Sequence, residues 1–302
     1  MTTTSILVSP AARSEATDWL LLVAPGMIWG ASFLFIAQGL EALGPSGVTF
    51  VRILIGFGTL ALIPAARGPV ARSDWAAIAL LGVLWLAFPL SMFPFAEQRV
   101  SSALTGMLNG SNPIFTVIVA SFLIKRAPSR ALAASLAVGL LGTVLIAWPT
   151  VFEGHSSLVG VLLTLAGVVS YGFAINLARP LQQRNGALPV IWRAQAVALV
   201  LTAPLGLPDL ASAHWTVVSL LAMLALGTLG TGLAYVLLAV AAGRVGATRA
   251  SATTFLIPAV ALFLGVMVRG EHVPLLSMIG GAVCVIGAWL TRRVQIGATQ
   301  SH

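Results

Sequence analysis

Hydrogen-bonding side chains interrupt the long apolar run at 100–124, where Asn109 and Asn112 come just before Pro113. A proline within a helix removes one backbone donor and displaces the preceding turn, which frees a carbonyl oxygen. The two amide side chains add donors and acceptors that carry no charge. This set predicts a site for a polar or zwitterionic solute, but a kinked helix that hydrogen-bonds to its neighbours would use the same residues. The sequence leaves both interpretations open.

Two arginines, Arg52 and Arg193, each lie inside an apolar run, roughly 9 Å from its start at the rise of an α-helix. Charges at such depth either reach back to groups at the helix ends or serve a function. For Arg52 the first interpretation offers Glu41 or Glu97 as partners. The second makes both arginines contacts for a substrate carboxylate or parts of a gate.

Aromatic side chains supply a third group of candidates. Trp29 and Trp85 lie in the middle of apolar runs, where an indole N–H has no lipid partner, so each is expected to face protein or a cavity. Aromatic, methionine and small polar side chains suit an amphipathic or aromatic solute, although helix packing alone explains any single one. The residues predicted to line such a cavity are Trp29, Ser32, Trp85, Phe88, Ser91, Met92, Asn109, Asn112, Tyr171, Tyr235 and Thr254.

Groups for acid–base, nucleophilic or metal chemistry are missing from the apolar runs. All eight Asp and Glu residues and all four His residues lie at the ends of runs or between them. The single cysteine, Cys284, builds neither a disulfide framework nor a metal site. We therefore expect no enzymatic activity, no cofactor and no metal. Proton coupling through a carboxylate at the midplane is not expected, whereas Glu97 or Glu271 at a helix end leaves coupling open.

The elements that position these residues follow from composition. Of 302 residues, 58% are hydrophobic and 8% are charged, and the mean hydropathy is +1.00. A spanning helix needs about 20 apolar residues and satisfies its own backbone within the bilayer. We predict an all-α integral membrane protein with ten transmembrane helices, near 19–38, 46–65, 74–96, 100–124, 131–149, 157–178, 187–206, 214–241, 246–268 and 274–291.

The second half of the chain repeats the first at an offset of 145 residues. The recurrence is seen in Val100 and Val245, Pro113 and Pro258, and Gly142 and Gly287. With five spans in each half, the second half must enter the membrane from the opposite side. Inverted-topology repeats of this kind are typical of secondary transporters, whose substrate site lies between the halves.

The repeat defines the predicted organisation of the chain. Tails at 1–18 and 294–302 flank one five-helix repeat at 19–149 and an inverted one at 150–293. Alternating access in such folds needs bend points and gates. The candidate hinge or gate residues are Pro89, Pro94, Pro113, Pro258, Arg52 and Arg193.

The positive charge of the chain is distributed as a topology signal. The net charge is +8, but the basic residues are scattered at the ends of apolar runs, which argues against a nucleic-acid partner. If the N-terminus is cytoplasmic, twelve of the 16 Lys and Arg residues lie inside, and only Arg99 and Arg269 lie outside. The remaining two, Arg52 and Arg193, lie within the apolar runs. The positive-inside rule thus predicts a multi-pass inner-membrane protein with both termini in the cytoplasm.

Four motifs occur in order along nearly the whole chain: Pro25–Phe33 (PGMIWGASF), Phe50–Arg52, Ala103–Pro113 and Gly270–Glu271. Together they resemble the EamA-type ten-helix branch of the drug/metabolite transporter superfamily, and within it bacterial exporters of aromatic and other neutral amino acids. One departure is Lys125–Arg126, which stands where the second repeat has Gly270–Glu271. That difference argues against a site built on matched acidic residues.

The resemblance implies an exporter of small neutral or zwitterionic metabolites, above all aromatic and other neutral amino acids. A broad-specificity exporter of drugs and metabolites is the alternative within transport. A membrane-embedded lipid-modifying enzyme is the alternative from another class. The expected partners are a small-molecule substrate and the lipid bilayer, and the oligomeric state is left open.

Overall fold

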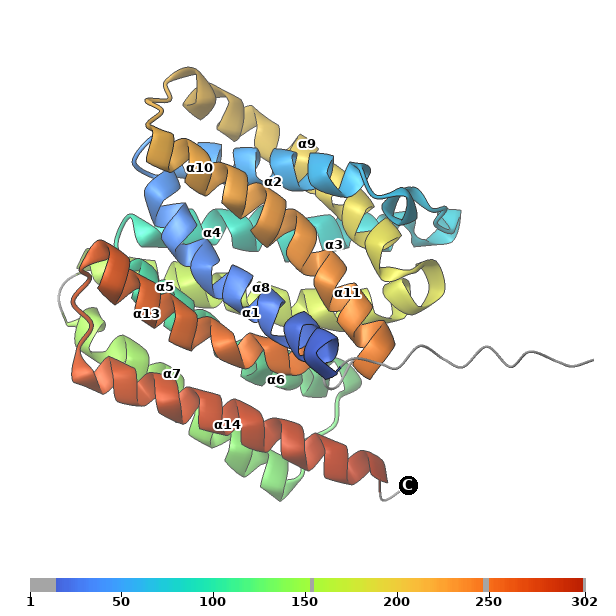
Figure 1. Cartoon of the computed structure of the whole chain (residues 1–302). Coiled ribbons are helices and arrows are strands. Elements are labelled where there is room, and N and C mark those ends of the chain that lie inside the picture. The colour runs from blue at the N-terminus through green and yellow to red at the C-terminus, as the bar shows by residue number, and fades with distance from the viewer. Residues whose placement is uncertain (1–14, 153–154, 247–249, 301–302) are drawn as a thin grey trace, which may run out of the picture.

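The computed structural model describes residues 15–152, 155–246 and 250–300, and every regular element in these ranges is helical (Figure 1). The elements are α1 (Glu15–Gly39), α2 (Pro45–Ala61), η1 (Pro64–Arg67), η2 (Arg72–Asp74), α3 (Trp75–Leu81), η3 (Gly82–Ala87), α4 (Phe88–Glu97), α5 (Ser102–Asn109), α6 (Asn112–Ile124), α7 (Arg130–Val151), α8 (His155–Asn185), α9 (Ala187–Ala211), α10 (Val217–Ala225), η4 (Leu226–Leu233), α11 (Ala234–Val245), η5 (Ser251–Leu256), α13 (Ile257–Arg269) and α14 (Leu275–Gln300).

The predicted all-helical membrane fold is confirmed. Among the described residues, eight helical stretches are long and apolar enough to cross a bilayer, and α5 with α6 makes a ninth if the bent pair is one span. The run expected at 46–65 corresponds to α2, which has 17 residues and ends at Ala61. It ends early because Pro64 begins the short 3₁₀ turn η1.

The four candidate hinge prolines occupy different places in their helices. Pro89, Pro113 and Pro258 are each the second residue of their helices, α4, α6 and α13. For Pro113, which follows the break after α5, the missing N–H has no intrahelical partner to lose, so the proline is tolerated there. Pro89 follows η3 inside the continuous span Arg72–Glu97, and Pro94 lies in the interior of α4. The bend of 41° between α5 and α6 falls at the residues just before Pro113.

Two π-helical segments, η3 and η4, lie inside long spans. η3 joins α3 to α4, and η4 joins α10 to α11. A π-helix pairs each N–H one residue further back than an α-helix does, and such segments are frequent at functional sites. Gly82 at the start of η3 and Gly227 in η4 are separated by the repeat offset of 145 residues.

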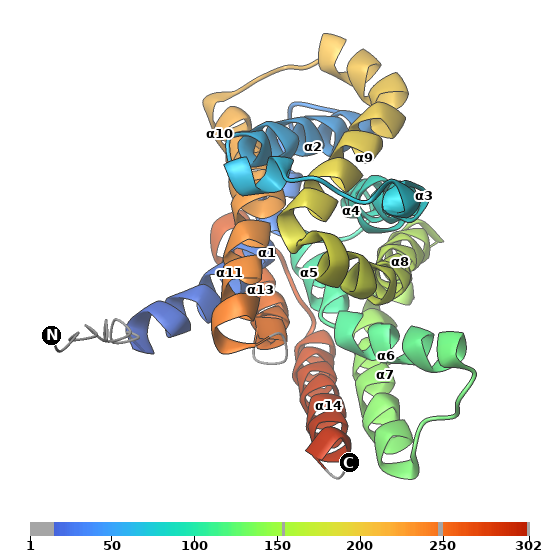
Figure 2. The same cartoon turned by 90° about the vertical axis from the view of Figure 1, so that its right-hand side faces the viewer.

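Helices from the two halves of the chain pack against each other throughout the bundle. α7 lies along α14 at one edge, and α2 lies along α9 at the opposite edge (Figures 1 and 2). Between them α1 packs on α13, α8 packs on α6, and α5 packs on α13. Glycines permit the close approach, since Gly142 lies against the backbone of Cys284 and Gly287 lies against Gly139.

Candidate functional site

Six aromatic rings from five elements gather where the two halves of the chain meet. Tyr235 contacts Trp29 and Trp85 edge to face, with ring centroids 5.6 and 5.5 Å apart. Phe93 contacts Phe33 at 5.6 Å and Tyr171 at 5.8 Å. We call these residues, Trp29, Phe33, Trp85, Phe93, Tyr171 and Tyr235, the aromatic cluster. Four of the predicted cavity residues, Trp29, Trp85, Tyr171 and Tyr235, are thereby brought together.

The cluster lies between two apolar cores. The pair Trp29–Gly30 recurs as Tyr171–Gly172 at an offset of 142 residues. Trp29 and Tyr171 are both half-buried, and both pack against each of two interior clusters of buried side chains. One core includes Leu86 and Tyr235, and the other includes Phe33 and Phe93. Both residues therefore lie at the junction of the two cores.

Hydrogen bonds to π-helical carbonyl groups tie the first helix of each half to the other half. The indole Nε1 of Trp29 on α1 donates to the carbonyl oxygen of Gly230 in η4 at 3.0 Å. The hydroxyl of Ser170 on α8 donates to the carbonyl oxygen of Leu84 in η3 at 2.7 Å. Both π segments are therefore held by a side chain next to the aromatic cluster.

Arg52 is buried beside the cluster, with 4% of its surface exposed. Its Nε donates to the Thr231 hydroxyl at 3.2 Å, and that hydroxyl donates to the Leu226 carbonyl oxygen at 3.1 Å. Its Nη1 has no hydrogen-bond partner among the described residues. Tyr171, Tyr235 and Glu97 are the ionisable groups within electrostatic range. The guanidinium thus points into the protein rather than out to the interface.

Arg193 lies apart from the aromatic cluster. Its Nη1 donates to the Pro189 carbonyl oxygen of its own helix at 3.2 Å. Its guanidinium carbon lies 5.8 Å from the centre of the Trp75 ring and 5.7 Å from that of Trp192. These are the contacts of an arginine held at a helix end by its own helix and by cation–π attraction.

The amide side chains differ in how well they are satisfied. Asn109 is 7% exposed, and its Oδ1 has no donor among the described residues. The Oδ1 of Asn112 accepts from the Thr116 hydroxyl at 3.2 Å. Gln195, which the sequence analysis did not single out, is fully buried and donates to the Thr231 carbonyl oxygen, while its Oε1 has no partner among the described residues.

The other predicted lining residues make local contacts. Ser32, Ser91 and Thr254 donate their hydroxyls to carbonyl oxygens one turn earlier, those of Ile28, Ala87 and Ser251. Met92 is half-buried where α4 faces Gly167 of α8. Phe88 is 40% exposed, on the outside of the bundle.

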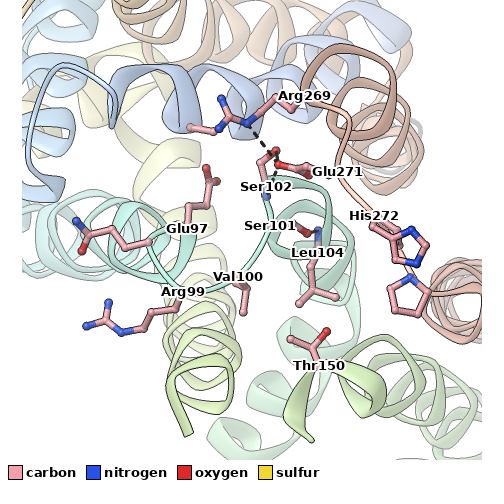
Figure 3. Close-up of a pocket in the computed structure, with 14 residues that line it drawn as sticks. Glu97, Arg99, Val100, Ser101, Ser102, Leu104, Thr150, Arg269, Glu271 and His272 are labelled. Atoms are coloured by element: carbon pink, nitrogen blue, oxygen red, sulfur yellow. Dashed lines mark hydrogen bonds and ion pairs between the residues drawn. The ribbon is translucent and has the colours of Figure 1, made fainter. Parts of the chain in front are cut away.

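A pocket of about 370 Å³ lies at the end of the bundle where α4 ends and α5 begins (Figure 3). We call it the Glu97 pocket. Its lining residues come from five segments: Ala37, Glu97, Gln98, Arg99, Val100, Ser101, Ser102, Leu104, Thr150, Arg269, Glu271, His272, Val273 and Pro274. The sequence marked Glu97 and Glu271 as helix-end carboxylates but did not show that they share a pocket.

Glu271 holds the start of α5. Its Oε1 accepts from the backbone N–H and the hydroxyl of Ser102 at 3.0 and 2.7 Å, and its Oε2 accepts from the N–H of Ala103 at 2.8 Å. Arg269 bridges this carboxylate at 3.5 Å and that of Glu41 at 3.0 Å. Glu41 is therefore paired with Arg269 and not with Arg52. The described residues contain no group of three or more His, Cys, Asp and Glu that could hold a metal ion.

Known proteins resemble this chain along most of its length. A probable terminal-alkyne amino-acid exporter from Streptantibioticus cattleyicolor is 28% identical over 282 residues, which cover 91% of this chain and 93% of the relative. A probable amino-acid metabolite efflux pump from Salmonella typhimurium is 22% identical over 289 residues, covering 90% and 94%. A solved crystal structure with 19% identity superposes with a TM-score of 0.59, covering 89% of this chain and 98% of the other, and so shares the fold.

A family model decides the assignment. The model of the EamA-like transporter family matches twice, at residues 18–148 and again at 158–293. Together the two matches cover nearly the whole sequence. The chain is therefore a multi-pass membrane transporter and not an enzyme, and it belongs to the EamA-like transporter family, a branch of the drug/metabolite transporter superfamily.

Proposed function

We propose that this transporter exports aromatic and other neutral amino acids across the cell inner membrane by alternating access. The observation that carries the proposal is the aromatic cluster at the junction of the two halves, with the unpaired Nη1 of Arg52 beside it. Aromatic rings suit an apolar or aromatic side chain, and a buried guanidinium suits a carboxylate. Two relatives named for amino-acid or amino-acid metabolite export support the substrate class.

The proposed architecture is ten spans in two inverted five-helix repeats. The double match of one family model supports the repeat. Reciprocal packing supports a twofold relation, because Gly139 and Gly142 on α7 meet Gly287 and Cys284 on α14, which are their own counterparts at the 145-residue offset in reverse order. The start of α1 and the end of α14 lie at the same end of the bundle, as an even number of crossings requires (Figure 1).

The ends of α6 and α13 add to this argument. Lys125 directly follows α6 and Gly270 directly follows α13, and both residues have left-handed backbone conformations, with φ of 54° and 65°. The two positions are 145 residues apart. A lysine in the conformation that favours glycine is uncommon, so the shared geometry supports a repeated helix ending.

In the proposed orientation both termini are cytoplasmic and the Glu97 pocket faces outward. The distribution of Lys and Arg between the two ends of the bundle supports it through the positive-inside rule. Pro89, Pro94, Pro113 and Pro258 are the proposed bend points. Trp29, Trp85, Tyr171, Tyr235, Arg52 and Asn109 are the proposed substrate contacts.

The proposal is tested by solute flux in liposomes that contain the purified full-length protein. Labelled phenylalanine, methionine and leucine are offered with and without a proton gradient, and we expect saturable flux that unlabelled aromatic amino acids inhibit. Absence of flux under every gradient would overturn the amino-acid assignment. Equal inhibition by unrelated drugs would favour the broad-specificity exporter instead.

A further inference from the structure

Two carboxylates in the Glu97 pocket have opposite surroundings. Glu271 accepts three hydrogen bonds from the start of α5 and lies against Arg269. Both carboxylate oxygens of Glu97 are buried, each with less than 1 Å² exposed, and neither has a hydrogen-bond partner among the described residues. Figure 3 shows the Glu97 side chain pointing toward Arg269 and Ser102. Glu271 therefore stabilises the start of α5, whereas Glu97 forms no hydrogen bond within the described part of the chain.

The charged groups around Glu97 do not pair with its carboxylate. Glu271 repels a second negative charge, and Arg52 and Arg269 are the cations within electrostatic range. Arg269 is already bound to Glu41 and Glu271, and the Nε of Arg52 is bound to Thr231. Burying a carboxylate that has no donor and no bonded cation is costly, so the group must take up a proton or find a cation.

Arg52 has a free donor that could bind this carboxylate, because its Nη1 has no acceptor among the residues the structure describes. It lies on α2, which packs against α4, the helix that ends at Glu97. An ionised Glu97 would attract this guanidinium away from Thr231. A protonated Glu97 leaves Arg52 on Thr231 and next to the aromatic cluster. The protonation state of Glu97 can thus decide which of two arrangements Arg52 adopts, as a coupled transporter requires.

We propose that Glu97 is the proton-binding group that couples export to proton entry, with the pocket as its access from outside. This rests on the proposed function. A proton from the outer solution binds Glu97 as the substrate leaves, and it is released to the cytoplasmic side when Arg52 returns. Exchange of one outgoing zwitterion for one incoming proton moves one positive charge inward, so a pH gradient and a membrane potential both drive it.

The experiment uses liposomes that contain the full-length protein, are acidic inside and have their membrane potential clamped. The wild type should accumulate labelled phenylalanine about tenfold at equilibrium for each pH unit of gradient, while an entrapped pH dye reports proton efflux. Glu97→Gln should abolish accumulation and proton efflux but retain exchange of labelled for unlabelled phenylalanine without a gradient. Glu15→Gln removes the same charge from an exposed side chain that does not line the pocket, and it should behave as the wild type.

Failure of coupling and failure of transport give different results. Wild-type exchange without gradient-driven accumulation would overturn the proton site and leave the exporter standing, whereas no exchange at all would overturn the proposed function. Accumulation by Glu97→Gln overturns the proton site. A Glu97→Gln variant that melts like the wild type but has lost exchange also overturns it, because Glu97 then binds substrate.

A chemical readout on the wild type covers the case in which Glu97→Gln does not fold. Dicyclohexylcarbodiimide reacts with protonated carboxyl groups in apolar surroundings. Peptide mass spectrometry should find its adduct on Glu97, decreasing as the pH rises. Absence of that adduct, or labelling of Glu271 in its place, would overturn the proposal.

Discussion

Trp29 and Gly230, which are 201 residues apart in sequence, are joined by a hydrogen bond of 3.0 Å from the indole Nε1 to the carbonyl oxygen. The carbonyl belongs to the π-helical segment η4, and the indole ring also touches Tyr235 at the start of α11. One side chain thus contacts both the π segment and the helix that follows it. Any movement of η4 relative to α1 must change the shape of the aromatic cluster.

Replacement of Trp29 by phenylalanine should separate the hydrogen bond from the ring contact. Trp29→Phe keeps an aromatic face against Tyr235 but leaves the Gly230 carbonyl without its donor, which costs about 1 kcal/mol in unfolding free energy. The KM for phenylalanine should rise as well, because the ring lines the proposed site. Thermal unfolding in detergent and saturable flux measure the two effects.

Trp85→Phe is the matched comparison. Trp85 touches the same Tyr235 ring, and its indole makes no hydrogen bond within the described part of the chain. It should lose less stability than Trp29→Phe. Equal losses in the two variants would contradict the importance of the bond to Gly230.

Two glycines on α2 offer a test of the contact between α2 and η4. A Cβ on Gly56 would lie 2.7 Å from the Cβ of Thr231, the residue that binds Arg52, whereas a Cβ on Gly58 meets nothing within 4 Å. Gly56→Ala should therefore destabilise the protein by about 1–3 kcal/mol and reduce flux, since overpacking displaces Thr231. Gly58→Ala should leave the melting temperature unchanged or slightly higher. Similar melting temperatures for the two variants would show that α2 and η4 do not pack this closely.

The sequence was sufficient for the features that depend on local chemistry. Apolar runs predicted the membrane-spanning helices, and the mid-run positions of Trp29 and Trp85 predicted side chains that face protein, as their contacts with Tyr235 show. One of the two interpretations of Pro113 was a kinked helix, and α5 and α6 meet there at 41°. Each of these signals is present within a single apolar run.

Features that depend on helix rotation and on distant partners were not predicted. The π-helical segment η3 adds a residue to its turn, which rotates the following residues by about 100° relative to an α-helix. Phe88 lies outside the bundle and Phe93, which was not predicted, lies in the aromatic cluster, because a spacing of five residues along α4 turns them to different faces. The Glu97 pocket was missed because Ser102 and Glu271, which help to build it, are 169 residues apart.

Cysteine labelling can test the proposed inversion directly. The only cysteine, Cys284, is buried, so a membrane-impermeant maleimide should label the wild type poorly. Ser212 and Ser129 are both exposed, after α9 and just before α7. In intact cells Ser212→Cys should react from outside, and Ser129→Cys should react only after the membrane is permeabilised. The reverse labelling pattern would show that the orientation is opposite to the one proposed. Labelling of both variants from outside would contradict the ten-span topology.

Asn109 distinguishes a binding group from a structural one. Its buried Oδ1 has no donor among the described residues, so Asn109→Ala removes an unsatisfied polar atom and should leave the melting temperature unchanged or raise it. If that oxygen receives the substrate ammonium group, flux should fall on the order of tenfold, which corresponds to about 1.4 kcal/mol.

Asn176 is the control, because its Nδ2 donates to the carbonyl oxygens of Thr116 and Gly172 at 3.0 and 2.8 Å. Asn176→Ala should lose about 1 kcal/mol of stability and retain the KM of the wild type. A stability loss in Asn109→Ala with unchanged flux would make Asn109 an interhelical hydrogen-bonding residue and remove it from the substrate site.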